Sequence, residues 1–205
     1  MRTERQEARQ REIEAAAYEV LAEKGYKATS MLAVAKWAAA SNETLYRWYG
    51  SKQALFAALV EANARAVRKR LSRSLEDGDD ALATLGRIGP LLVELVAGDR
   101  AVALNRAAVG DVDETATLGP TIAASGRAAV VPLLERLMQK AIDARELVDT
   151  DAAEAAEIYV RLLIGDLQIR RVIGVLHAPS RQEAETRAAA ALGLFLRLFG
   201  PSPLR

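Results

Sequence analysis

Apolar residues recur along most of this chain at intervals of three and four positions, the spacing that lines one face of an α-helix. No stretch alternates apolar and polar residues as a half-buried strand would. The pattern therefore predicts an all-α protein of about nine helices. The predicted helices cover residues 3–24, a short segment from 31, and residues 42–48, 52–75, 81–97, 100–109, 118–144, 152–176 and 181–199.

Glycines and prolines mark the ends and the weak points of these helices. Gly25 is the expected stop of the first one, and the acidic run at 76–80 is the best domain boundary. Pro90 and Pro132 fall inside predicted helices, where a proline removes a backbone hydrogen bond. Each of them should kink its helix or split it.

Residues 29–52 form the most informative segment. Ser30 and Ser41 are natural N-caps, and each precedes a short apolar-periodic stretch. Within residues 42–48, Leu45 and Trp48 lie three apart and should face inward. Two short helices joined by a tight turn and followed by a longer helix are the layout of a helix-turn-helix, whose second helix enters the DNA major groove. We expect an N-terminal three-helix DNA-binding domain.

The residues left facing outward carry the chemistry for DNA binding. They offer hydrogen-bonding groups, an arginine and a tyrosine, which suit base edges and phosphates. Lys52 opens the next helix, where a cation opposes the helix dipole, which favours an external anion such as phosphate. The alternative is a small helix with ordinary solvated polar residues. The predicted DNA contacts are Ser30, Lys36, Ser41, Asn42, Glu43, Thr44, Tyr46, Arg47, Tyr49 and Lys52.

Several of these positions together resemble the DNA-binding signature of the TetR (tetracycline-repressor) family. The matching residues are GYKATS at 25–30, Val34-Ala35, Ser41, Thr44-Leu45-Tyr46, and Tyr49, Ser51 and Lys52. The likeness covers roughly the first 60 residues. It implies a DNA-binding regulator with a helical bundle as its C-terminal effector and dimerisation domain.

The chain also departs from that family pattern. Ala39 stands where the family usually has glycine, so this turn needs a negative φ or carries a small strain. Asn42-Glu43 replaces a frequent Lys-Gly, and Leu32 replaces a common arginine. A carboxylate at Glu43 would accept from a cytosine amino group or repel phosphate, so the operator sequence stays open.

Composition and charge fit this interpretation. The 205 residues have a net charge of +1, but residues 1–70 hold 13 Lys/Arg against 8 Asp/Glu, whereas the remainder has a net charge of −4. The basic part is the part with the helix-turn-helix, as phosphate binding requires. Arg2, Arg5 and Arg9 form either an arm on the DNA backbone or a solvated helix end.

Enzymatic chemistry is poorly supported. The chain has no cysteine, and His177 is its only histidine. We therefore expect no enzyme, no cofactor and no metal site. The charged N-terminus lacks the apolar core of a signal peptide, and no run of about 18 apolar residues occurs. A cytoplasmic location is expected.

The last two predicted helices carry more apolar residues than one buried face needs. This excess indicates burial against a second subunit, and the resemblance implies a four-helix bundle across a two-fold axis. A thick monomer core is the alternative. The apolar residues of the last helix are Ala188, Leu192, Leu194, Phe195, Leu198 and Phe199. The predicted dimer interface is formed by Leu162, Ile169, Ile173, Leu192, Phe195 and Phe199.

A small-molecule site is expected among the middle helices, although plain core packing would explain the same apolar residues. Residues 145–166 resemble the effector domains of TetR regulators with an AefR-like C-terminus. The predicted lining is Leu91, Leu95, Leu104, Arg106, Leu133, Leu137, Met138, Leu163, Asp166 and Leu167.

From these features we predict a helix-turn-helix DNA-binding domain at residues 1–52 and a ligand-binding and dimerisation domain at 53–205, bridged by helix 52–75. The expected function is that of a homodimeric repressor that binds a palindromic operator in double-stranded DNA and is released by a small apolar or amphipathic effector. The alternative is a TetR-like DNA-binding or structural protein that needs no effector.

Overall fold

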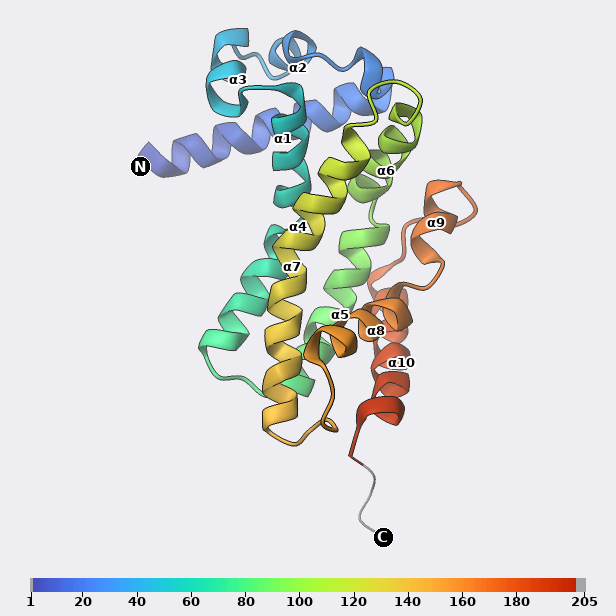
Figure 1. The fold of residues 1–205 in the computed structure, drawn as a ribbon. Helices are drawn as coiled ribbons and strands as arrows, with labels where there is room; N and C mark the ends of the chain where they lie inside the picture. The colour runs from blue at the N-terminus through green and yellow to red at the C-terminus, as the bar shows by residue number, and fades with distance from the viewer. Residues whose placement is uncertain (1, 202–205) are drawn as a thin grey trace. The chain divides into compact units, whose positions relative to one another are not determined.

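A computed structural model describes residues 2–201, with the side chains of 2–4 and 127 left out. Ten helices and no strands occupy these residues, which confirms the all-α prediction (Figure 1). None of the ten is by itself long and apolar enough to cross a membrane, although α5 and α6 together, across a bend, reach that length. The helices are α1 (Arg2–Ala28), α2 (Met31–Trp37), α3 (Asn42–Tyr49), α4 (Lys52–Glu76), α5 (Ala81–Ala97), α6 (Asp99–Asp111), α7 (Leu118–Asp143), α8 (Ala152–Ile164), α9 (Leu167–Val172) and α10 (Arg181–Phe199).

The count of about nine helices is corrected to ten, because the segment predicted as one helix at 152–176 is two. Gly165 separates α8 from α9, with φ 50° and ψ −128°. A positive φ of this kind is open to glycine and strained for other residues, so α8 ends there. The apolar periodicity continues across the break, and for that reason the pattern did not reveal it.

Neither interior proline splits its helix. Helix α5 runs through Pro90 and α7 runs through Pro132. Ile88, Gly89 and Leu92 around Pro90 are buried, so packing holds α5 together despite the missing backbone donor. Of the two outcomes that the sequence left open, a split is excluded.

The described chain forms two compact units. The first comprises residues 2–62 and 103–125, and the second comprises residues 63–102 and 126–201. Helices α4, α6 and α7 each contribute residues to both units. The functional division at residue 52 stays a prediction, because compactness does not show what each part does.

Each unit has its own apolar core. In the first, Ile13 from α1, Leu45 from α3 and Phe56 from α4 are fully buried. Tyr26 meets Phe56 edge-on, with ring centroids 4.9 Å apart. These contacts fix α3 against α1 and the start of α4, and α2 joins the same core through Met31 and Val34.

In the second unit, α5 packs against α10 and α8 (Figure 1). The helices approach closely at Gly89, where a Cβ atom would lie 2.8 Å from the Ala188 Cβ and 2.9 Å from the Tyr159 hydroxyl. That buried hydroxyl donates to the Leu85 carbonyl at 3.2 Å. Burial raises the pKa of Tyr159, so the phenol stays protonated.

Candidate nucleic-acid interface

The two short helices begin where the sequence predicted. The Ser30 hydroxyl accepts a hydrogen bond from the Ala33 N–H at 3.1 Å, and the Ser41 hydroxyl accepts one from the Thr44 N–H at 3.0 Å. Both N-caps are therefore confirmed. Because each cap fixes the first turn of its own helix, Ser30 sets the start of α2 and Ser41 sets the start of α3.

The turn between α2 and α3 adopts the strained alternative. Ala39 has a φ of +47°, in the left-handed region that favours glycine. The Ala40 N–H donates to the Ala35 carbonyl at 2.8 Å. Arg9 donates from Nη2 to the Ala39 carbonyl at 2.7 Å and pairs through Nη1 with Glu12 at 2.5 Å. Arg9 thus supports the turn from α1, whereas the Arg2 side chain lies outside the described ones.

Helix α3 buries one side chain and exposes polar ones. Leu45 is fully buried, Trp48 is half-buried, and Tyr46 is 50% exposed. The exposed surface of this short helix therefore presents an amide, a carboxylate, a phenol and a guanidinium. Among the predicted DNA contacts, Thr44, Tyr49 and Lys52 are half-buried and the exposed ones are Ser30, Lys36, Ser41, Asn42, Glu43, Tyr46 and Arg47.

Helix α2 adds two large exposed side chains that the sequence analysis did not assign to the site. Leu32 is 50% exposed and Trp37 is 46% exposed. The indole Nε1 of Trp37 donates to Glu19 at 2.6 Å, and the Lys24 ammonium lies 5.8 Å from the ring centroid. Because the exposed and the buried residues of α2 are all apolar, the sequence pattern did not show which of them lie on the surface.

Lys52 has an internal partner. Its Nζ donates to the Tyr26 carbonyl and lies 3.8 Å from the centroid of the Tyr26 ring. The side chain is half-buried, and this burial lowers the pKa of Lys52 despite the nearby Asp111 and Glu114 carboxylates. A lysine in the first turn of α4 therefore needs no external phosphate to explain it, and its contact with DNA stays a prediction.

The segment that follows α6 folds within the same unit as the helix-turn-helix. Asp111 is buried and accepts hydrogen bonds from the Thr115 hydroxyl at 2.6 Å and from the N–H groups of Thr117 and Leu118 at 2.9 and 3.0 Å. Glu114 pairs with Lys27 of α1 at 2.9 Å. The sequence predicted one helix that ends at 109 and another that begins at 118, and nothing in residues 110–118 alone indicates a partner on α1.

The predicted ligand-binding residues do not share one environment. Leu104 belongs to the core of the first unit, where Arg106 lines a cavity of about 480 Å³ with Tyr26. Asp166 is exposed and faces Arg170 at 3.7 Å. The remaining predicted lining belongs to the second unit, where Leu167 is buried, Leu91, Leu95 and Leu133 are half-buried, and Leu137, Met138 and Leu163 are fully buried.

The predicted dimer residues also divide. Ile169 and Ile173 are 56% and 63% exposed. Phe195 is fully buried against Tyr159, with ring centroids 5.5 Å apart, so within this chain it is a core residue that exposes no surface to a second subunit. Leu162, Leu192 and Phe199 are half-buried. The exposed apolar side chains of α10 are instead Leu194 and Leu198, at 41% and 61%.

Two sequence profiles match the chain. Residues 13–59 match the profile of bacterial regulatory proteins of the tetR family, and residues 83–201 match that of the AefR-like transcriptional repressor C-terminal domain. The first match contains α2 and α3, together with Ser30, Ser41 and the outward face of α3. Among curated proteins, none matches the chain.

Solved structures of the same fold span nearly the whole chain. A protein from Mesorhizobium loti MAFF303099 described as a TetR-family transcriptional regulator is 23% identical, with a TM-score of 0.76 over 95% of this chain and 98% of that one. A TetR regulator from Agrobacterium tumefaciens is 27% identical, with a TM-score of 0.72 over 95% of each chain. The flavonoid-responsive regulator FrrA is also 27% identical, with a TM-score of 0.67 over 96% of this chain and 99% of that one.

Proposed function

We propose that this chain, which belongs to the TetR family of transcriptional regulators and has an AefR-like C-terminal domain, is a homodimeric repressor that a small-molecule effector releases from its operator. Family membership makes the protein a transcriptional regulator and not an enzyme. The repressor activity, the dimer and the effector are the parts that we propose.

One observation carries the DNA-binding part of the proposal. Helix α3 is anchored by the buried Leu45 and presents Asn42, Tyr46 and Arg47 to solvent. An arginine or an asparagine on such a helix can make bidentate contacts to guanine or adenine in the major groove. We assign base contacts to this face and backbone phosphate contacts to Lys36 and Lys52, since the Lys52 ammonium has three donors and the Tyr26 carbonyl takes one of them.

The dimer part rests on exposed apolar surface in the second unit. Leu194 and Leu198 lie four residues apart on α10, hence on one side of the helix. Ile169 and Ile173 form a similar exposed pair at α9. Two copies joined through such surfaces would carry two helix-turn-helix motifs, and a two-fold dimer matches a palindromic operator.

The effector part rests on how the chain is divided. Helices α4, α6 and α7 each supply residues to both units, so a ligand bound in the second unit has continuous helices through which to bias the first. The likeness to a flavonoid-responsive regulator supports a response to a small organic molecule. A ligand that prefers one conformer by roughly 1–3 kcal/mol would change operator affinity by roughly 5–150-fold.

Transcription in vitro tests the sign of regulation. The template carries a promoter overlapped by an operator obtained by selection, and a second template carries a scrambled operator as the control. A repressor lowers transcript from the first template alone, in proportion to occupancy. An increase in transcript would contradict repression while leaving operator binding intact.

A further inference from the structure

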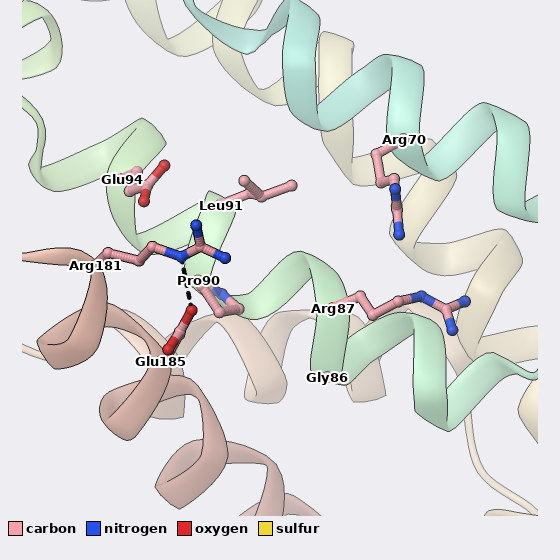
Figure 2. A pocket seen from close by; sticks show the side chains of 8 residues that line it. All are labelled: Arg70, Gly86, Arg87, Pro90, Leu91, Glu94, Arg181 and Glu185. Atoms are coloured by element: carbon pink, nitrogen blue, oxygen red, sulfur yellow. Dashed lines mark hydrogen bonds and ion pairs between the residues drawn. The ribbon is translucent and has the colours of Figure 1, made fainter.

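Three arginines from three helices of the second unit converge on one surface groove. Arg70 comes from α4, Arg87 from α5 and Arg181 from α10, and the groove they line has a volume of about 530 Å³ (Figure 2). This volume lies within the range of small-molecule sites. The three arginines are far apart in the chain, so no local sequence motif indicates that they line one groove.

The two ends of the groove differ in charge. In Figure 2, Arg70 and Arg87 lie at one end, and Arg181 lies at the other beside Glu94 and Glu185. The Arg181 Nε donates to the Glu185 carboxylate at 2.9 Å, which neutralises part of that end. The groove therefore has a cationic end and a mixed end that also offers carboxylate acceptors.

Arg70 is the guanidinium whose N–H donors are not engaged within the described part of the chain. It is exposed, and among the residues that the structure describes it has no hydrogen bond or ion pair. Arg87 uses one nitrogen, Nη2, for Asp79 at 2.8 Å and for Thr84 at 2.9 Å, which holds its side chain in place. A carboxylate suits this end, because a guanidinium binds it with two parallel hydrogen bonds.

The floor between the two ends is apolar and contains one carbonyl that lacks its ordinary helix donor. Pro90 and Leu91 form the apolar part. Because Pro90 has no N–H, it cannot donate to the carbonyl of Gly86 four residues earlier, and Gly86 also lines the groove. A ligand hydroxyl would satisfy that acceptor, and a flat ring would cover the apolar floor and stack on a guanidinium.

We propose that this groove binds a hydroxylated aromatic carboxylate. The carboxylate lies against Arg70 and Arg87, the ring covers Pro90 and Leu91, and the hydroxyl donates to the Gly86 carbonyl or to a carboxylate of the mixed end. This inference rests on the proposed function, because it supplies that function's effector with a chemical class and a site.

Isothermal titration of the full chain with 4-hydroxybenzoate tests the proposal. We expect one molecule bound per chain, and binding weakened by about tenfold or more in Arg70→Ala, since hydrogen bonds to a charged group are lost. The matched control is Arg68→Ala, an exposed α4 arginine outside the groove, which should bind as the unmodified chain does. The uncharged methyl ester should bind at least as weakly as 4-hydroxybenzoate binds to Arg70→Ala.

The outcomes separate this inference from the proposed function. Undetectable binding of 4-hydroxybenzoate, equal binding of acid and ester, or equal binding by Arg70→Ala and the unmodified chain would overturn the groove assignment. Operator binding by the ligand-free protein, measured on the same samples, tests the regulator independently. If Arg70-dependent binding occurs without release of the operator, the groove stands and effector release through it fails.

Discussion

Helices α3 and α10 each bury one face against the rest of the chain, but their exposed faces differ in polarity. Each buries one face: α3 through Leu45 alone, and α10 through a line of small residues that ends at Phe195. The outward face of α3 is polar, with Tyr46 and Arg47 exposed, whereas α10 exposes Leu194 and Leu198. Polar groups on a small anchored helix suit DNA, and exposed leucines suit another protein surface. The exposed side of each helix, and not its buried side, therefore indicates its partner.

The buried side of α10 gives the largest expected effect. Phe195→Ala removes a ring packed against Tyr159 and against Phe199, whose centroid lies 5.0 Å away, and should lower the free energy of unfolding by about 3–5 kcal/mol. Urea denaturation followed by circular dichroism measures it. A loss below about 1 kcal/mol would mean that Phe195 is not a core residue and would reopen its place in the interface.

The exposed side of α10 should affect assembly instead of folding. Leu198→Glu places a charge in the proposed subunit contact and should weaken the dimer by at least about 100-fold, because a buried charge without a partner costs several kcal/mol. Sedimentation equilibrium measures the dissociation constant. Ala189→Glu is the matched control, since Ala189 is exposed and lies nine residues earlier on the opposite side of α10. Equal dimers in both variants would exclude this surface as the contact.

On α3, substitution should weaken DNA binding without unfolding the protein. Tyr46→Ala removes a half-exposed phenol and should lower operator affinity by about tenfold, the cost of one good base or phosphate contact. Fluorescence anisotropy with a labelled operator measures affinity, and the thermal midpoint should stay unchanged. Tyr46→Phe keeps the ring and separates the hydroxyl from the aromatic surface. Unchanged affinity in both variants would remove Tyr46 from the site.

A smaller effect is expected in the turn that precedes α3. Ala39→Gly relieves a positive φ and should raise the free energy of unfolding by about 1 kcal/mol. Chemical denaturation gives the change, and operator affinity serves as the functional readout. If the variant is less stable than the parent, the strain at Ala39 is not real.

The smallest expected effect is a pH dependence in the second unit. Burial and the neighbouring Asp80 raise the pKa of Glu146, and its buried Oε2 has no hydrogen-bond partner among the described residues. An acid whose pKa is raised on folding favours the folded state when protonated, and that contribution is lost as pH rises through the folded pKa. Glu146→Gln should therefore gain roughly 0.5 kcal/mol at pH 7. Unfolding at pH 7 and pH 4 should show the gain shrinking in acid, and a constant difference would contradict this assignment.

The sequence predicted the local features well because their causes are local. Ser30 and Ser41 cap helices through their own side chains, and the spacing of Leu45 and Trp48 gives the face of α3. The bounds of α5 and α10 also follow from periodicity and flanking residues. These features could be predicted without any knowledge of tertiary contacts.

What the sequence missed depends on contacts between distant residues. Apolar periodicity could not tell Phe195 in the core from Leu198 on the surface, because both extend the same stripe. The arginine groove joins positions on α4, α5 and α10, and Asp111 binds backbone groups beyond a turn that looked like a simple connector. Lys52 binds the Tyr26 carbonyl, 26 positions away in the chain. The sequence showed only a cation at the start of a helix, which favoured an external phosphate, and it could not show this internal acceptor.

Selection of operator DNA by the purified protein from a random library, repeated over a range of salt concentrations, tests most directly whether α3 reads DNA sequence. We expect one enriched palindromic site, bound by two chains with a dissociation constant of roughly nanomolar order, and an affinity that falls steeply as salt rises. Recovery of no preferred sequence, with only weak binding at low salt, would contradict the assignment of α3 as a reader of DNA sequence.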